Sequence, residues 1–306
     1  MFVGTGGWAY FRGPWRGNLE VYSRVFNSVE VNSTFYSYPD IRQVRSWRKR
    51  VPESFQFSVR SHGDLTHRYE LQPVDESFHV YYRMVDICEV LNAEVLHLLT
   101  PARVALDYQK LHGMAEFFNS VDVSSPRIAW EIRGQRTADE WKELTRIMQD
   151  HNIVQCVDLS IERQRVQSDI LYTRLFGKGA HNLYQFDDKE IREVNAKAEE
   201  QPKRSYLIFH GGRMYEDAAR LKAYRETGKF PRAWGPVDTE SLMKVLGEDA
   251  TFPATRAELI RSQGWKVIDL AADERTHASS LLGWLPDRTY LSLADIRGAL
   301  EKRRVG

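Results

Sequence analysis

A regular alternation of strand-like and helix-like runs constrains this chain more than any other feature. Eight short apolar segments, rich in β-branched and aromatic residues, predict strands. They lie at 2–8, 28–36, 55–62, 93–99, 127–132, 153–160, 170–177 and 204–212. Helical patterns lie between them, for example at 41–50, 78–91, 137–150 and 187–200. Eight strands that are mostly followed by helices predict an α/β fold, a TIM-type (β/α)8 barrel.

A doubly wound open sheet is the alternative arrangement of such units, and the sequence leaves it open. The run GTGGW does not complete the dinucleotide-binding pattern GxGxxG, which disfavours that alternative. We assign residues 1–228 to the barrel and 229–238 to a linker. Residues 239–306 predict a small C-terminal helical domain, because short amphipathic patterns there are separated by Pro253 and Pro286.

Composition describes an ordinary globular protein, with 28% charged and 42% hydrophobic residues. The net charge of +1 gives no general attraction to nucleic acid or to a membrane surface. No apolar run approaches the roughly 20 residues of a membrane helix, and no export signal is visible. Cys88 and Cys156 have no CxxC partner, so we expect a reducing, cytoplasmic setting. GxSxG, HExxH and P-loop motifs are absent from the sequence.

The second predicted strand carries an unusual polar face. In NSVEVNSTFYSYP, Val29 and Val31 alternate with Glu30, Asn32 and Thr34. In a barrel one of these faces points inward, and functional groups gather at the carboxyl ends of the strands. The same alternation applied to the other strands predicts a pocket at the barrel mouth. Its polar residues are Glu30, Asn32, Arg60, Glu131, Arg133, Asp158, Arg174 and His210.

A structural interpretation of these charges stays open as well. Glu30 with Arg60, and Glu131 with Arg174, could be interstrand ion pairs that close the barrel top. The sequence also allows a packed strand histidine at His97. The basic run at 42–50 is more typical of a solvated helix face than of a nucleic-acid contact.

Several segments together resemble the YecE-like family, also called domain of unknown function number 72. They are VGTGGWAYFRGPWRG, FNSVEVNSTFYSYP, FQFSVRSHGDLTH, AWEIR, YTRLFG and YLIFHGG. The resemblance covers about residues 2–222 and implies a βα barrel without an established reaction, whose fold is similar to endonuclease IV and xylose isomerase. It implies mouth positions for Trp8, Glu30, Asn32, Thr34, Phe35, Tyr36, Arg60, Thr66, His67, Glu131, Arg133 and Arg174. The C-terminal segment resembles domain of unknown function number 2795.

The first functional hypothesis is a phosphodiester hydrolase or another nucleic-acid-processing enzyme. Its catalytic candidates are Glu30, Glu131, Asp158 and His67. Arginines grip phosphate well, and aromatic rings stack on bases. The expected ligand-binding residues are Trp8, Asn32, Thr34, Phe35, Tyr36, Arg60, Arg133, Arg174 and His210.

The cofactor and the partners follow from the same residue types. A divalent metal is compatible with the carboxylates, and Mg²⁺ or Mn²⁺ suits them better than a multi-zinc site, because few histidines are available. We expect an anionic ligand, with nucleic acid as one possibility, and no membrane. The C-terminal helical domain could dock a protein partner or cover the barrel.

Two other functions compete with hydrolysis of a phosphodiester. A glycosidase would use Glu30 and Glu131 as its carboxylate pair, one of them with a raised pKa. A non-catalytic module would simply bind phosphate or nucleic acid, since a charged pocket without a nucleophile motif can bind without turnover.

Overall fold

The computed structural model describes the chain except for residues 12–17, 180–181, 201–203, 232–234, 272–273 and 306. It divides into two compact units, each of which is continuous in space but not in sequence. The first unit comprises Met1–Leu175 and Asp188–His210, and the second comprises Phe176–Asp187 and Gly211–Gly306.

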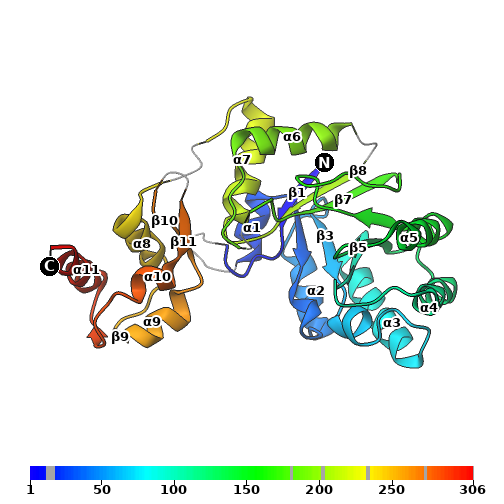
Figure 1. Ribbon diagram of the computed structural model, residues 1–306, viewed down its shortest axis with the longest axis horizontal. Helices are drawn as coiled ribbons and strands as arrows, with labels where there is room; N and C mark the ends of the chain where they lie inside the picture. The colour runs from blue at the N-terminus through cyan, green and yellow to red at the C-terminus, as the bar shows by residue number, and fades with distance from the viewer. Residues whose placement is uncertain (12–17, 180–181, 201–203, 232–234, 272–273, 306) are drawn as a thin grey trace. The chain divides into compact units, whose positions relative to one another are not determined.

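The first unit is built on eight parallel strands (Figure 1). They are β1 (Phe2–Thr5), β2 (Ser28–Val31), β3 (Gln56–Arg60), β4 (Val95–Thr100), β5 (Arg127–Ile132), β6 (Val154–Cys156), β7 (Ile170–Leu175) and β8 (Arg204–Phe209). Their order in the sheet is β6-β5-β4-β3-β2-β1-β8-β7. The two outer strands also meet, because Val157 and Thr173 form a parallel bridge. The sheet is therefore a nearly closed barrel, which confirms the predicted fold class over the open sheet.

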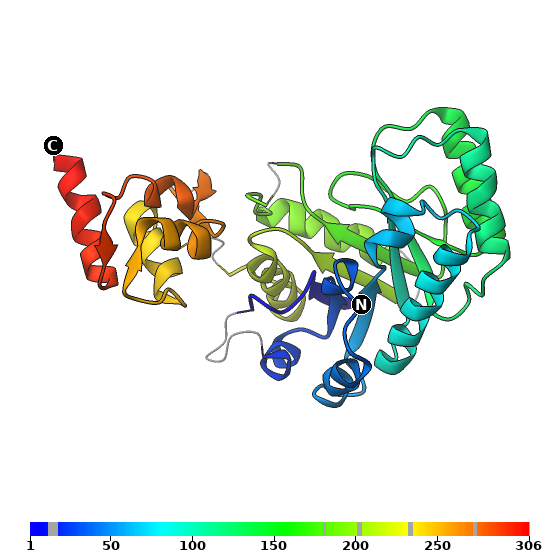
Figure 2. The same ribbon diagram turned by 90° about the horizontal axis from the view of Figure 1, so that it is seen from below.

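Helices follow most of the strands and lie on the outer side of the barrel (Figures 1 and 2). They are α1 (Leu19–Val25), α2 (Ile41–Lys49), α3 (Asp75–Leu91), α4 (Tyr108–Asn119), α5 (Ala138–Asp150) and α6 (Asp188–Glu199). Two short helical turns, η1 (Ser33–Phe35) and η2 (Asp64–Arg68), follow β2 and β3. The connection 157–169 between β6 and β7 contains no helix.

Six of the eight predicted strands run too far at their carboxyl ends, and those at 93–99 and 127–132 do not. The strand predicted at 28–36 ends at Val31, because Asn32 adopts helical dihedral angles (φ −90°, ψ −20°) and η1 begins after it. Thr34 is buried in this turn, where its Oγ1 lies 2.8 Å from the carbonyl oxygen of Val31 and 2.5 Å from that of Arg60. The hydroxyl thus ties the end of β2 to the end of β3.

Part of the barrel is filled by an apolar core cluster. Its buried residues are Val95, Ala129, Val154, Cys156, Ile170, Tyr172, Tyr206 and Ile208, with Phe2 packed against them. The alternate residues of the strands, such as Val29, Phe57 and Trp130, are also fully buried and occupy the opposite strand face. Both faces of the strands are therefore covered, as expected of a parallel sheet.

The second unit contains five helices among its described residues: α7 (Met214–Thr227), α8 (Asp238–Gly247), α9 (Arg256–Gln263), α10 (Ala278–Leu282) and α11 (Leu293–Val305). Two small antiparallel sheets accompany them, β10 (Val267–Asp269) with β11 (Arg275–His277) and β9 (Ala254–Thr255) with β12 (Thr289–Tyr290). The sequence indicated the helices but not these short ladders, which are two or three residues long. A separate core around Leu242, Leu246 and Ile268 holds the α8–α11 segment together.

Within the described part of the chain, no helix is both long and apolar enough to cross a lipid bilayer.

Helix α5 begins with the capping box that the sequence TADE indicates. Glu140 N donates to Thr137 Oγ1 (3.2 Å), and Thr137 N donates to Glu140 Oε2 (2.6 Å). Replacing Thr137 with alanine should lower the free energy of unfolding by about 1 kcal/mol, since an orphan N–H loses its acceptor. Urea denaturation checks this, with Thr137→Ser as the nearly neutral control. Equal stability of Thr137→Ala and the parent chain would contradict the use of this cap.

Candidate functional site

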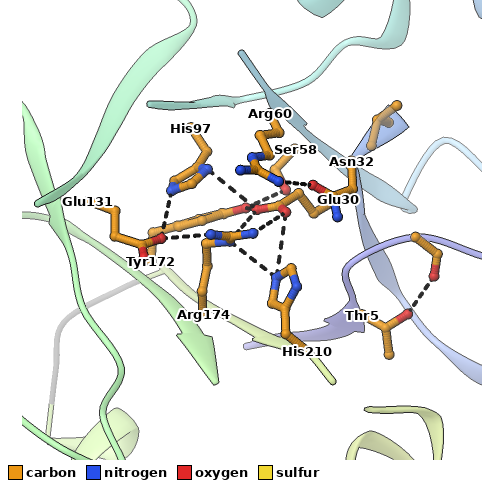
Figure 3. Close-up of polar contacts among 12 residues, drawn as sticks. Thr5, Glu30, Asn32, Ser58, Arg60, His97, Glu131, Tyr172, Arg174 and His210 are labelled. Atoms are coloured by element: carbon orange, nitrogen blue, oxygen red, sulfur yellow. Dashed lines mark hydrogen bonds and ion pairs between the residues drawn. The ribbon is translucent and has the colours of Figure 1, made fainter. Parts of the chain in front are cut away.

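A buried arginine joins two carboxylates across the barrel interior (Figure 3). Arg174 on β7 donates from Nη1 to Glu131 Oε2 at 2.7 Å. Its Nε lies 3.1 Å from Glu30 Oε2, and Nη2 donates to Glu30 Oε1 at 3.2 Å. Glu30 lies on β2 and Glu131 on β5, and neither strand is a neighbour of β7 in the sheet. These contacts therefore place all three side chains inside the barrel, as the alternation of β2, β5 and β7 predicts.

Two histidines and a tyrosine complete this network. His97 Nε2 lies 3.2 Å from Glu131 Oε2, so it carries the proton that an ionised carboxylate must accept. His210 Nε2 accepts a hydrogen bond from Arg174 Nε at 3.2 Å. Tyr172 donates its hydroxyl hydrogen to Glu30 Oε2 at 2.9 Å. We call Glu30, His97, Glu131, Tyr172, Arg174 and His210 the floor of the site.

A glycine in the GTGG motif makes room for His210. A Cβ added to Gly6 would lie 2.2 Å from His210 Cε1, so a larger residue there would displace the imidazole. This glycine thus serves the packing of the floor.

The electrostatics of the floor keep both carboxylates ionised. Burial alone would raise the pKa of Glu30, but the positive charge of Arg174 and the neighbouring His210, His97 and Arg60 outweigh it and lower that pKa to about 2. The pKa of Glu131 is likewise held well below its usual value, because Arg174 and His97 outweigh its burial. Neither carboxyl group carries a proton at neutral pH.

The other floor groups stay neutral. Burial, followed by repulsion from Arg174, lowers the pKa of His97 and brings that of His210 well below its usual value. Burial, together with the charge of Glu30, raises the pKa of Tyr172 well above its usual value. The floor therefore holds fixed charges and fixed hydrogen bonds near pH 7, with no group poised to exchange a proton.

Arg60 lies at the end of β3 and keeps an unused donor. Its guanidinium carbon is 3.9 Å from the centre of the Phe35 ring, and Nη1 donates to Asn32 Oδ1 at 2.8 Å. Its Nε is buried and has no acceptor among the described residues. Phe35 and Asn32 therefore hold the guanidinium in place. Its buried Nε still lacks an acceptor in the described part of the chain, and an unpaired buried N–H of a charged group is costly.

His67 lies beside this arginine, in the turn η2. The imidazole stands edge-on to Phe35, with ring centres 4.9 Å apart, and Nδ1 lies 2.8 Å from Thr66 Oγ1. Arg103 donates to the backbone carbonyl of His67 at 2.7 Å. Partial burial, and then the positive charges of Arg103, Arg60 and Arg133, lower the pKa of His67 to about 4. His67 is therefore a neutral imidazole among cations.

The remaining predicted site residues differ in how they join the site. Arg133 donates from Nε to Glu131 Oε1 at 2.7 Å and keeps 43% of its side chain exposed. Tyr36 is 75% exposed and is close enough to Arg60 to influence the pKa of its guanidinium group. Trp8 packs edge-on against Trp47, with ring centres 5.2 Å apart.

Asp158 stands in a different role from the other carboxylates. It lies in the turn after β6, where its Oδ1 accepts hydrogen bonds from Ser160 N at 2.9 Å and Ser160 Oγ at 2.6 Å. These two bonds shape its own turn.

The sequence did not predict site roles for two residues of the floor, His97 and Tyr172, or for Arg103, which contacts His67. The sequence indicates a packed strand residue at His97, which is indeed fully buried, yet the imidazole also bonds Glu131. Tyr172 shares the strand face of Arg174, so the same alternation contained the signal for it. Arg103 follows the end of β4 and gives no pattern of its own, because a loop residue has no periodicity.

The carboxylates do not form a metal centre with the residues around them. His97, Glu131 and Cys156 bring ligand atoms within 4.8 Å of one another. However, Glu131 Oε2 already accepts hydrogen bonds from Arg174 and His97, and the guanidinium supplies the positive charge there. Burial also raises the pKa of the Cys156 thiol well above its usual value, whereas a metal requires the thiolate. The predicted Mg²⁺ or Mn²⁺ site thus does not fit the floor.

The basic run on α2 is largely used within the fold. Arg48 donates to backbone carbonyls such as that of Phe55, at 2.9 Å. Arg42 pairs with Asp40 at 3.0 Å, and Arg50 pairs with Glu20 at 3.2 Å. These contacts favour the solvated helix face over a nucleic-acid footprint.

The fold and the site place this chain in the class of (β/α)8-type barrels with a charged mouth. Residues 2–235 match the family model described as "Protein of unknown function DUF72". The chain therefore belongs to the DUF72 family.

Individual relatives agree with this assignment. UPF0759 protein YecE of Escherichia coli K12 is 30% identical over 78 residues, which are 25% of this chain and 29% of that protein. The chain thus spans less than a third of this curated relative in the match. A DUF72 family crystal structure from Enterococcus faecalis V583 has a TM-score of 0.59 at 17% identity, covering 78% of this chain and 98% of that one. One from Thermotoga maritima MSB8 has a TM-score of 0.59 at 18% identity, covering 74% and 98%.

The likeness to endonuclease IV is weaker. The enzyme from Thermus thermophilus has a TM-score of 0.43 at 12% identity, covering 69% of this chain and 92% of that one. A likeness of this degree carries no information about the reaction.

The floor predicts how stability depends on pH. The unfolded chain binds protons at its histidines below about pH 6.5, whereas His97 and His210 stay neutral in the fold, so stability should fall from there downward. It should fall again below pH 4.5, because Glu30 takes up a proton in the unfolded chain but stays ionised in the fold down to about 2. Glu30 alone should account for about 3 kcal/mol. Urea denaturation between about pH 7 and pH 2 measures both losses.

The control for this prediction is Glu30→Gln, which keeps hydrogen bonds to Arg174 and Tyr172 but does not titrate. Its profile should keep the fall near about pH 6.5 and fall less steeply than the parent chain below about pH 4.5, where Glu131 still titrates. A profile parallel to that of the parent chain would refute the assignment of the acid branch to Glu30.

Proposed function

We propose that the barrel mouth binds a phosphate ester through Arg60. The observation that carries this proposal is the buried Nε of Arg60, which has no acceptor among the described residues while Phe35 and Asn32 hold the guanidinium still. The Nε–Nη2 edge of an arginine matches two oxygens of a phosphate or carboxylate. A bound oxyanion supplies the hydrogen bond that the free chain leaves unmade, after a small movement of the atoms that cover Nε.

The charges around Arg60 support an anionic ligand. The charged groups that act on Arg60 and His67 include four guanidinium groups, those of Arg60, Arg103, Arg133 and Arg174, and two carboxylates, Glu30 and Glu131. Because His67 is neutral, positive charges outnumber negative ones among these groups. Arg174 is only 3% exposed and bonded to both carboxylates, so it positions the floor and does not itself reach the ligand.

Aromatic groups extend the proposal to nucleotides and nucleic acid. Tyr36 is strongly exposed beside Arg60, and Trp8 is half-buried near the end of β1. A ring next to a phosphate-binding arginine suits a base attached to that phosphate. We therefore favour a nucleotide or nucleic-acid phosphate within the class of phosphate esters.

Carbohydrate hydrolysis receives no support from the floor. A glycosidase needs one carboxylic acid that is protonated near neutral pH, whereas the pKa values of Glu30 and Glu131 are both lowered. Arg174 would have to be removed to change this.

Loss of Arg60 should weaken phosphate-ester binding about 10- to 100-fold, because a charge-assisted hydrogen-bond pair is lost. Isothermal titration with bis(p-nitrophenyl) phosphate on Arg60→Ala measures the effect. Arg45→Ala is the matched control, since Arg45 is an exposed arginine of α2 and should bind like the parent chain. Equal binding by Arg60→Ala and the parent chain, or none by the parent chain, would remove the proposal.

Hydrolysis of the bound ester is the second candidate, and His67 is the observation that favours it. Its Nδ1 is engaged by Thr66, and Nε2 has no partner among the described residues. Burial and then the neighbouring cations hold the pKa of His67 low, and a bound anion beside Arg60 offsets the cations and so raises that pKa. His67 could then accept a proton from a water that attacks phosphorus and return it to the alkoxide released when the ester P–O bond breaks.

His67→Ala should therefore keep ester binding within about twofold but lower p-nitrophenol release by about 100-fold or more. The absorbance of the released product measures turnover, and calorimetry measures binding on the same preparation. His67→Asn, which retains the bond to Thr66, serves as the control for local structure and should be equally slow. Turnover that persists in both variants would exclude His67, whereas binding without turnover in the parent chain would leave a pure binding module.

Two finer assignments accompany this proposal. The family model ends at residue 235, so the resemblance of the C-terminal segment to domain number 2795 stays a proposal. A cytoplasmic setting is proposed on the two free, buried thiols of Cys88 and Cys156, which persist most easily in a reducing compartment.

A further inference from the structure

The second unit contains a groove that is separate in sequence from the residues of the barrel mouth. It has a volume of about 780 Å³ and runs between the 283–288 loop and α11. Its lining residues are Arg256, Gly283, Trp284, Leu285, Pro286, Arg288, Ala294, Asp295, Gly298, Ala299 and Lys302.

One wall of the groove is a face of α11 without bulky side chains. Ala294, Gly298 and Lys302 are spaced by four residues, so they lie on one side of the helix. A Cβ added to Gly298 would meet no atom within 4 Å. A glycine in a helix interior lowers helix stability relative to alanine, and no neighbour in the described unit requires it. The hollow at Gly298 therefore offers space to a group from outside the unit.

The opposite wall is apolar. Trp284 keeps 47% of its surface exposed, and Leu285 of the same loop is buried. Pro286 continues this wall. An indole that faces a hollow with a small-residue helix opposite resembles the aromatic anchor points of protein interfaces, where tryptophan contributes strongly.

The charges of the groove are mainly positive. Arg256, Arg288 and Lys302 line it, together with the carboxylate of Asp295. Both Nη atoms of Arg288 donate to Asp295, at 3.0 and 2.6 Å, so these two charges offset each other. Arg256 lies 3.6 Å from the exposed Asp287, and the ammonium group of Lys302 forms no ion pair with any described side chain. A positive charge thus remains at the α11 end.

We propose that this groove binds an acidic segment of a partner protein, with an apolar side chain against Trp284 and carboxylates beside Lys302 and Arg256. Nucleic acid fits less well, because Leu285, Pro286 and the two alanines make the walls apolar and Asp295 faces the groove. The proposal is independent of the phosphate-ester function of the barrel.

The test first selects peptide ligands and then measures their binding to variants in which the groove is altered. Random peptides displayed on phage are selected on the full chain, and the enriched peptide is measured by fluorescence anisotropy. We expect enriched peptides to combine Asp or Glu with a large apolar residue. Gly298→Leu introduces a better helix former but fills the hollow, and Lys302→Glu reverses the charge. Each should weaken binding at least about tenfold.

Two controls isolate the groove. Glu301→Gln changes an exposed residue of the same helical turn outside the lining, and Arg60→Ala changes the barrel mouth. Both should bind the peptide as the parent chain does, so a failure here is distinguishable from a failure of the barrel proposal.

The proposal is overturned if no peptide is enriched, if the enriched peptides lack acidic residues, or if Gly298→Leu binds them normally. It is also overturned if single-stranded DNA binds and Lys302→Glu removes that binding. A chain that self-associates through Gly298, seen in sedimentation as a dimer that Gly298→Leu dissociates, would assign the groove to a second copy instead.

Discussion

The ion pairs of Arg174 are the interaction on which the rest of the barrel interior depends. A guanidinium inside a barrel must give up its water, and only well-placed carboxylates compensate for that loss. Arg174 meets Glu30 and Glu131 from two strands that are not its neighbours, so one side chain connects β2, β5 and β7 through the interior. Replacing it would leave two carboxylates buried without their main cation, which is more costly than never having buried them.

The buried floor and the less buried residues above it differ in what they do. The floor groups bond one another and are nearly inaccessible, so they hold their positions whether or not a ligand is present. Arg60, Arg133 and His67 are less buried than the floor, and their orientation is set by Phe35, Glu131 and Thr66. Such preorganisation lowers the cost of binding a charged group, because the dipoles and charges are already aligned. The same burial that makes the floor rigid also removes its carboxylates from acid–base chemistry.

The two proposed binding surfaces differ in their chemistry. In the barrel, fixed guanidinium groups suit compact oxyanions with defined geometry. In the second unit, an apolar wall and flexible cations such as Lys302 suit the carboxylates of an extended segment.

The sequence by itself determined the barrel and the inward faces of its strands. Apolar residues at period two and helices of period 3.6 are local properties of a chain, so strand alternation alone assigns Glu30, Arg60, Glu131 and Arg174 to the interior. Only the tertiary structure decided which carboxylate meets which arginine. Glu30 pairs with Arg174 and not with the expected Arg60, because β2 and β7 face each other across the barrel while Arg60 is drawn to Asn32 and Phe35. The roles of His97 and Arg103, the turn that buries Thr34 and the hollow at Gly298 follow from neighbours distant in sequence. No local sequence pattern encodes the distances between residues that are far apart in sequence. Those distances determine the pKa of a buried group and the shape of a binding surface.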